Sequence, residues 1–151
     1  MDFGGEHLVL APRTRVWRAL NDPVSLAGCL PGCERFEATG ENAFAATVAV
    51  RVGSLAARFS GTLVVSDIVD GRSCTLTGRG QGGVAGFAGG SARVSLEDAA
   101  DGTLLRYAIA AEIGGKLASV GGRLIGAFAA ATADRFFARM VRLLAESESQ
   151  T

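Results

Sequence analysis

The sequence predicts an α+β protein in which a curved, seven-stranded antiparallel sheet wraps around a long C-terminal helix. Apolar and polar residues alternate with a period of two from Glu34 to Ile113, as they do in half-buried strands. Short turn sequences separate the strands of this region, and connections this short exclude parallel crossovers. A long apolar region then runs from Lys116 to Ala145. A curved sheet that grips this helix would bury the apolar face of each element.

The N-terminal segment predicts one strand and two short helices. The run His7–Leu10 predicts the first strand. Pro12 suits the first turn of a helix over residues 13–20, where a missing N–H costs nothing. The sequence Asn21-Asp22-Pro23 ends this helix, because a residue before proline avoids the helical region. A second short helix is expected over residues 24–28.

Six further strands are expected after these helices, the first of them beginning at Glu34. The next two alternate clearly over residues 44–52 and 55–65, and the last three are predicted over 73–82, 88–97 and 103–113. The turns between strands contain glycine, aspartate or asparagine, which favour tight connections. These turns are Gly40-Glu41-Asn42, Gly53-Ser54, Asp70-Gly71 and Asp101-Gly102.

One domain is expected to span residues 1–146, followed by a disordered tail over 147–151. A chain of 151 residues can bury a sizeable core and leaves little room for a second domain. Gly114-Gly115 ends the sheet, and the final helix is predicted as one continuous element from Lys116 to about Ala145.

Glycine is the unusual part of the composition. The chain has 21 glycines among 151 residues, about twice the usual fraction. Seven lie between Gly78 and Gly90, and five lie between Gly114 and Gly126. On one predicted strand, three of them share the face of Cys74, and such glycines mark a bend, a bulge or a close approach. They indicate either tight packing of the long helix on a curved sheet, or space left for a ligand.

The first half of the final helix has two different faces. Small side chains gather on one face over residues 118–133, which would allow a close approach to the sheet. A bulky stripe lies on another face and would contact the short helices, line a cavity or bind an external partner. This stripe consists of Leu117, Val120, Leu124 and Phe128.

Charge and cysteine content exclude several classes of protein. Fifteen cations balance fifteen carboxylates, so the chain lacks the basic surface that nucleic-acid binding requires. The longest apolar run, over residues 124–133, is far too short to span a membrane. The N-terminus has no basic region before an apolar stretch, so we expect no signal peptide and a cytoplasmic location. Three cysteines, an odd number, do not form a disulfide framework.

No catalytic or metal site is predicted. His7 is the only histidine, so a histidine pair or a metal triad cannot form. Cys29 and Cys33 have CxxxC spacing without a third ligand, which favours a turn with two small side chains over zinc or redox chemistry. Cys74 is expected to be an inert core thiol. The run Gly78–Gly83 loosely matches the phosphate-binding pattern GxGxxG, but no helix follows it.

Several segments carry a specific joint pattern. The N-terminal part contains A-P-x-x-x-V-W-x-A-L-N-D-P over residues 11–23 and C-L-P-G-C-E over 29–34. A glycine-rich block, G-x-G-x-G-G-x-A-G-F-A-x-G-x-A, covers residues 78–92. The final helix region contains G-G-K-L at 114–117, G-R-L-I at 122–125 and F-F-A-R at 136–139. Together, over residues 2–145, these segments resemble the G-subunit family of carbon monoxide dehydrogenase (the CoxG family).

The resemblance implies a fold and a role. That family belongs to the START-like, polyketide-cyclase-like (SRPBCC) superfamily with the helix-grip fold, whose members hold hydrophobic ligands. It implies a non-catalytic accessory protein beside a molybdenum hydroxylase such as carbon monoxide dehydrogenase. Family members have been linked to membrane recruitment of the enzyme and to binding a quinone that accepts its electrons. Many carry a C-terminal extension thought to reach the membrane; this sequence ends at Thr151 without one, and peripheral association at the inner membrane face is expected instead of anchoring.

A hydrophobic ligand is therefore expected between the sheet and the long helix, namely menaquinone, another isoprenoid quinone or a lipid. Aromatic side chains would stack on a ring, aliphatic side chains would hold the tail, and the glycines would supply room. No covalent cofactor is expected. The residues expected to line this cavity are Trp17, Leu30, Phe59, Phe87, Tyr107, Leu117, Leu124 and Phe128.

Two other functions stay open at the level of sequence. The first is an enzyme of the cyclase or aromatase kind that uses Tyr107, His7 or Arg79 as an acid or electrostatic group, although titratable residues do not cluster in the sequence. The second is an assembly factor without a small ligand. It would dock on the dehydrogenase through the stripe from Leu117 to Phe128.

Overall fold

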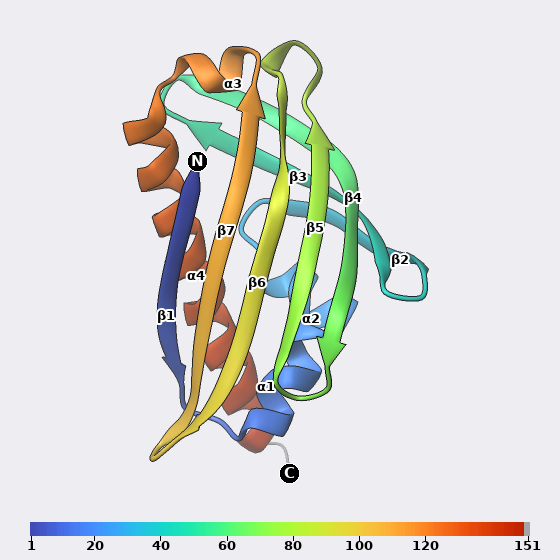
Figure 1. Ribbon diagram of the computed structural model, residues 1–151, viewed down its shortest axis with the longest axis vertical. Coiled ribbons are helices and arrows are strands. Elements are labelled where there is room, and N and C mark those ends of the chain that lie inside the picture. The colour runs from blue at the N-terminus through green and yellow to red at the C-terminus, as the bar shows by residue number, and fades with distance from the viewer. Residues whose placement is uncertain (150–151) are drawn as a thin grey trace.

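The computed structural model of the chain shows a seven-stranded antiparallel sheet bent around one long helix (Figure 1). It describes residues 1–149, with side chains up to Glu146. The strand order is β1-β7-β6-β5-β4-β3-β2, so the strands after the short helices form a meander and β1 closes against β7. This arrangement confirms the predicted fold class.

The strands follow the predicted alternation and are longer than expected at several ends. Their bounds are β1 (Asp2–Val9), β2 (Cys33–Gly40), β3 (Ala43–Val52), β4 (Leu55–Val69), β5 (Ser73–Gln81), β6 (Phe87–Ala99) and β7 (Gly102–Gly114). The first strand begins well before His7, because Gly4 and Gly5 already pair with Ala108 and Tyr107 of β7. The pairing of β4 with β5 shifts its register after Ser66, where a bulge is accommodated.

Five helical elements complete the described chain. They are α1 (Arg13–Leu20), α2 (Pro23–Cys29), the 3₁₀ turn η1 (Gly83–Ala85), α3 (Lys116–Ser119) and α4 (Gly122–Ser149). The prediction of one continuous helix from Lys116 was wrong. Gly121 has a φ of +94°, a left-handed conformation that ends α3 and starts α4 in a new direction. Residues 147–149 of the predicted tail continue α4, and residues 150–151 lie outside the described residues.

Polar side chains fix the two short helices against the rest of the molecule. Asp22 caps α2 by accepting hydrogen bonds from the Val24 N–H and the Ser25 hydroxyl, with Pro23 at the first helical position. The guanidinium of Arg13 donates to the Asp98 carboxylate at 3.0 Å and to the Gly71 carbonyl at 2.9 Å. One side chain of α1 thereby joins two turns of the sheet.

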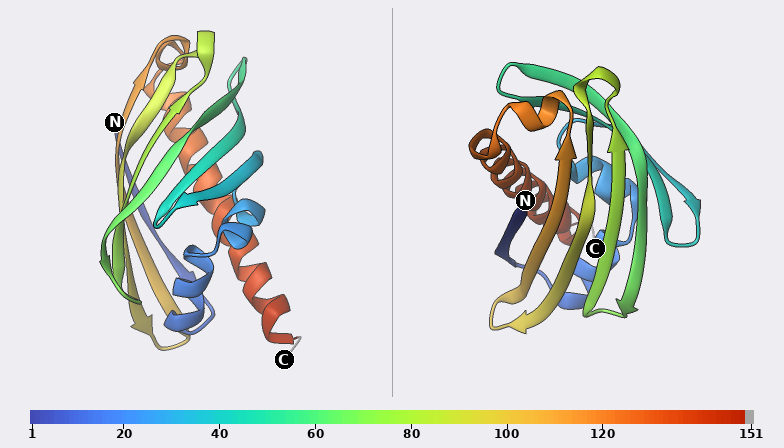
Figure 2. Two further views of the ribbon diagram at one scale, coloured as in Figure 1. Left: turned by 90° about the vertical axis from the view of Figure 1, so that its right-hand side faces the viewer. Right: turned by 45° about the horizontal axis from the view of Figure 1, so that its top comes forward.

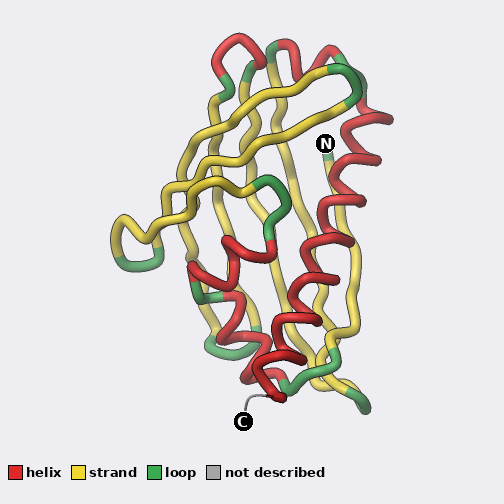
Figure 3. Tube along the Cα trace, turned by 180° about the vertical axis from the view of Figure 1, so that it is seen from behind, coloured by secondary structure: helices red, strands yellow, loops and turns green. Residues whose placement is uncertain are grey.

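All of the described helices except η1 and α3 lie against the concave face of the sheet, as Figures 2 and 3 show from the side and from behind. The core consists of two clusters of buried residues, one near each end of the sheet, called the lower and the upper core after their places in Figure 1. The lower cluster is the larger one and joins α1, the lower parts of the strands and the C-terminal half of α4 through residues such as Val16, Leu105 and Met140. The upper cluster consists of Val52, Leu117 and Ile125.

The contact between the β5–β6 connection and α3 generates a prediction about stability. Gly86 has a φ of +106°, and a Cβ there would lie 3.0 Å from the Cα of Gly115. Replacing it by alanine adds backbone strain and a clash, so Gly86→Ala should lower the free energy of unfolding by about 2–3 kcal/mol. Gly28→Ala is the matched control, because that α2 glycine has open space around it; alanine should leave stability unchanged or raise it by up to ~1 kcal/mol.

Denaturant unfolding followed by circular dichroism measures both variants. An equal effect of the two substitutions would contradict the close contact between η1 and α3.

Candidate functional site

A cavity of about 580 Å³ lies between the sheet and α4. This volume is within the range of small-molecule sites in proteins. Its walls come from the inner faces of strands β3 to β7, from α4 and from α2, with residues of the lower and upper core at its two ends. The lining is almost wholly apolar, so the site suits a hydrophobic molecule.

Small side chains create this space. On the sheet, Ala88 and Ala92 of β6 and Ala111 of β7 face the cavity, and on α4 Ala129 and Ala133 do so. Because these residues fill so little volume, the helix and the sheet enclose a gap between the two clusters of the core. The small face predicted for the helix therefore leaves room over this part of the sheet.

The glycines of β5 distinguish the two interpretations drawn from the sequence. A Cβ at Gly78 would first meet Leu63 at 3.4 Å, and a Cβ at Gly80 would meet Phe59 at 3.8 Å. Both neighbours belong to β4, and no atom of α4 lies within reach, so the helix does not pack tightly on this floor. Gly82 has a different role, because a Cβ there would collide with the ring of Phe59.

The glycines of α4 do allow a close approach, but to the edge strand. The nearest atom to a Cβ at Gly126 would be Cε1 of Phe3 at 4.0 Å, and at Gly122 it would be the terminal methyl of Met1 at 3.2 Å. The first half of α4 is thus held beside β1, and the middle of the sheet stays uncovered.

Five of the eight residues expected to line the cavity do so, and three lie elsewhere. The five are Leu30, Phe59, Tyr107, Leu117 and Phe128. Trp17 packs against the lower core instead. Phe87 is 42% exposed and Leu124 is 47% exposed, both outside the cavity lining. That these residues bind a ligand stays a prediction.

The stripe from Leu117 to Phe128 is not one continuous surface. Leu117 is buried in the upper core, Leu124 points to solvent, and Phe128 lines the cavity. The expectation that this stripe forms a docking face is therefore wrong. The helical spacing that placed residues before and after Gly121 on one face does not apply, because α3 and α4 are separate helices.

Four polar side chains face the cavity: Asn21, Cys74, Tyr107 and Thr132. The Asn21 amide donates to the Trp17 carbonyl at 2.8 Å. The hydroxyls of Tyr107 and Thr132 make no hydrogen bond with any described residue. Two hydrogen-bonding groups are thus free to meet a polar atom of a bound molecule.

Tyr107 and Cys74 are held in their neutral forms. Burial raises the pKa of the Tyr107 hydroxyl, and the nearby Asp134 carboxylate raises it further. Burial also raises the pKa of the Cys74 thiol. Tyr107 therefore offers a neutral O–H donor, with no tendency to act as a base at neutral pH.

An aromatic cluster that the sequence did not predict joins α4 to the first and last strands. The rings of His7 and Phe137 are stacked with centroids 4.2 Å apart, and Tyr107 lies 6.1 Å from each of them. Phe136 meets Phe137 edge to face at 5.1 Å. His7 is thereby occupied in packing. In the sequence Phe136 and Phe137 belong to the F-F-A-R segment of the family resemblance, which does not indicate that they contact His7 and Tyr107.

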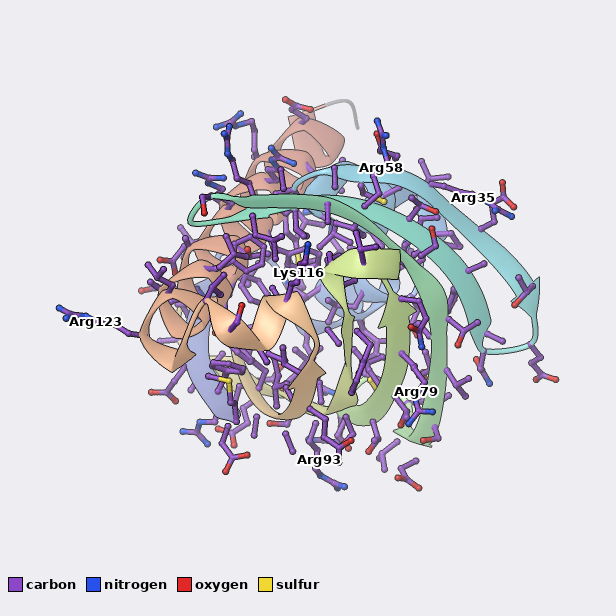
Figure 4. The ribbon with its side chains drawn as sticks, turned by 90° about the horizontal axis from the view of Figure 1, so that it is seen from above. Arg35, Arg58, Arg79, Arg93, Lys116 and Arg123 are labelled. Atoms are coloured by element: carbon purple, nitrogen blue, oxygen red, sulfur yellow. The ribbon has the colours of Figure 1, made fainter. Side chains whose placement is uncertain are left out.

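Arg79 lies on the other side of the sheet. It is exposed on β5 between two inward-facing glycines and points away from the molecule in Figure 4. Of the three candidate acid groups for an enzyme, only Tyr107 lines the cavity. Within residues 1–149, no group of three or more histidine, cysteine, aspartate or glutamate side chains is placed to hold a metal ion. The described helices include none with the length and hydrophobicity to cross a bilayer.

Comparison with known proteins agrees with this geometry. The family model described as the G subunit of carbon monoxide dehydrogenase (CoxG) matches residues 5–145. The chain belongs to the CoxG family. No curated protein gives a significant match. A conserved protein from Geobacillus kaustophilus is 28% identical to this CoxG-family chain, with a TM-score of 0.91 over 97% of both chains.

Two more distant structures share the fold. Ara h 8.0201 has a TM-score of 0.67 at 12% identity, over 97% of this CoxG-family chain and 98% of its own. The Zhui aromatase/cyclase from Streptomyces sp. R1128 has a TM-score of 0.63 at 12% identity, over 93% and 91%. These likenesses confirm the predicted helix-grip fold for the CoxG-family chain.

The three free thiols of the CoxG-family chain should react at different rates. Cys29 and Cys74 are buried and their pKa values are raised by burial, so little reactive thiolate forms at pH 8. Cys33 is partly exposed. In a time course with iodoacetamide read by peptide mass spectrometry, Cys33 should be alkylated first, and the other two only after unfolding. Alkylation of native Cys74 as fast as Cys33 would show that the cavity is open to water and reagent.

Proposed function

We propose that this CoxG-family protein is a non-catalytic carrier of a hydrophobic molecule, which we infer to be menaquinone, another isoprenoid quinone or a lipid. The observation that carries the proposal is the apolar cavity of about 580 Å³ between the sheet and α4. Burying apolar surface there stabilises a complex by about 25 cal/mol for each Å² removed from water. The free hydroxyls of Tyr107 and Thr132 suit a ligand with one polar group on an otherwise apolar body.

The partner in this proposal is a molybdenum hydroxylase of the carbon monoxide dehydrogenase type. The family description names that enzyme, and the chain matches the family over most of its length. The protein would act in the cytoplasm at the inner face of the membrane. It would couple the enzyme to the quinone pool by holding the molecule that takes up its electrons.

Catalysis by the chain itself is the competing function, since an aromatase/cyclase has the same fold. Fold alone does not decide between them, because function depends on the residues of the site. The described lining offers a single candidate acid, Tyr107, whose pKa is raised, while His7 is stacked on Phe137 and Arg79 lies outside. This composition supports a binding site more than a reaction site.

Filling the cavity should remove the ligand. Ala133 lines the cavity, and Ala133→Phe should displace a bound molecule, because the added ring occupies its volume. Ala130→Phe is the matched control, placed on the exposed side of α4. Native mass spectrometry of protein purified from its host should show an added mass on the wild type and on Ala130→Phe, and none on Ala133→Phe. Absence of any lipid or quinone from the wild type, with no thermal shift on adding menadione, would overturn the proposal.

The Tyr107 hydroxyl should contribute to affinity only when the ligand carries an acceptor. Tyr107→Phe keeps the ring and its packing, so the loss of one neutral hydrogen bond should weaken menadione binding about 3- to 10-fold. The hydrocarbon 2-methylnaphthalene has a similar body and no carbonyl, so its affinity should not change. Competition with a fluorescent apolar dye measures both constants. An equal loss for the two compounds would assign Tyr107 a packing role alone.

A further inference from the structure

We propose that the end of the molecule formed by η1, α3 and the first turn of α4 is the surface that contacts an anionic lipid bilayer. Its apolar residues are Val84, Phe87 and Leu124, and its cations are Lys116 and Arg123; together they are called the apolar end. The inference rests on the proposed function for its purpose, which is exchange of a ligand with lipid. Its physical basis is independent of any ligand.

Three large apolar side chains are exposed at this end. Val84 is 85% exposed, Leu124 is 47% exposed and Phe87 is 42% exposed. They come from different elements that meet there, because η1 and α3 touch through Gly86 and Gly115. These side chains do not form one continuous patch; they are separate apolar tips on adjoining elements at one end of the sheet.

The two charged side chains of η1, α3 and the first turn of α4 are both cations, and the nearest carboxylate along the chain is the exposed Glu112 of β7. Lys116 and Arg123 are exposed and make no ion pair with a described residue, and Figure 4 shows them from above. Residues 82–87 and 115–124 contain no carboxylate, and the turn at Gly53-Ser54 is uncharged. Apolar tips beside free cations fit the interface of a bilayer with anionic headgroups.

The opposite end of the sheet has a different character. The β4–β5 and β6–β7 turns lie there, as Figure 1 shows, and they and their flanking residues carry four exposed carboxylates. These are Asp67, Asp70, Asp98 and Asp101. Asp98 is paired with Arg13, and the other three make no ion pair with a described residue. An anionic surface would therefore favour contact with the apolar end over these turns, which orients a chain whose net charge is zero.

The shape of the apolar end favours a bilayer over a protein partner. Val84 stands on a three-residue 3₁₀ turn with most of its side chain in water, separate from Leu124 on α4. A lipid interface accepts separate apolar tips, whereas a protein interface requires close shape complementarity over its core. Lys116 and Arg123 have stems long enough to reach headgroups while their apolar neighbours insert.

The apolar end also lies directly over one end of the cavity. Leu117 of α3 and Ile125 of α4 are buried beneath it and line the cavity. The cover over this end includes α3, a helix of four residues between Gly115 (φ +73°) and Gly121 (φ +94°), together with Val52 and Ile125 of the upper core. An apolar molecule that left the cavity here would enter lipid without crossing water.

Vesicle flotation of the full chain tests this surface. Wild-type protein should float with vesicles of phosphatidylcholine and phosphatidylglycerol, and more weakly with phosphatidylcholine alone. The double variants Val84→Ser/Leu124→Ser and Lys116→Glu/Arg123→Glu should each bind the anionic vesicles at least about tenfold more weakly. The matched control is Val69→Ser/Arg72→Glu at the opposite end, where Val69 is 54% exposed; its binding should equal that of the wild type.

The inference is overturned if the wild type does not float with anionic vesicles, or if the control variant loses binding as much as the others. It is also overturned if the apolar-end variants keep vesicle binding and lose only binding to the dehydrogenase. Menadione affinity measured on the same variants should be unchanged, which shows that they are folded. If vesicles bind and menadione does not bind to any form, the proposed carrier function fails while the bilayer surface stands.

Discussion

The long helix is attached to the sheet at its two ends and along one edge, and this attachment determines the rest of the structure. Met140 and Leu144 hold its C-terminal half in the lower core, and Ile125 holds its start in the upper core. Between these points α4 lies beside β1 and presents alanine to the middle of the sheet. Stability is concentrated in two separate clusters, so the space between them is maintained without being filled.

The residues around this space show why glycine is so abundant in the chain. On β5 Gly78 and Gly80 are not packed against α4, at Gly82 glycine makes room for the ring of Phe59, and on α4 it brings the helix against β1. Close approach and open space, the two interpretations of the sequence, each apply to some of these glycines. Bringing the helix to the edge strand is what keeps it off the centre of the sheet.

Residue patterns predict the fold well and the site only in part. Alternation over residues 34–113 depends on the local geometry of a strand, so the six strands and their inward faces could be derived from it. The break at Gly121 could not, because a glycine inside an apolar run is compatible with a helix until its φ is known. That break places Leu117 on a separate helix from Leu124 and Phe128. Leu124, on the first turn of α4, lies beside Gly53 and is 47% exposed, whereas Phe128, one turn later, lines the cavity. Phe87 lies outside for a different reason: Ala88 and Ala92 of β6 line the cavity, and alternation along the strand places Phe87 on the other face.

The aromatase/cyclase and Ara h 8.0201 share this architecture at 12% identity, and function depends on the residues of the site rather than on the fold. Here the charged groups lie on the outside, the single histidine is stacked between strand and helix, and two uncharged hydroxyls remain inside. Burial raises the pKa of Tyr107 and of Cys74, so both groups stay protonated at neutral pH. A carrier needs only volume, an apolar wall and a polar contact that fixes orientation. The electron transfer chemistry in the proposed function would then belong to the bound molecule and the partner enzyme, and the contribution of this chain is to keep that molecule out of water.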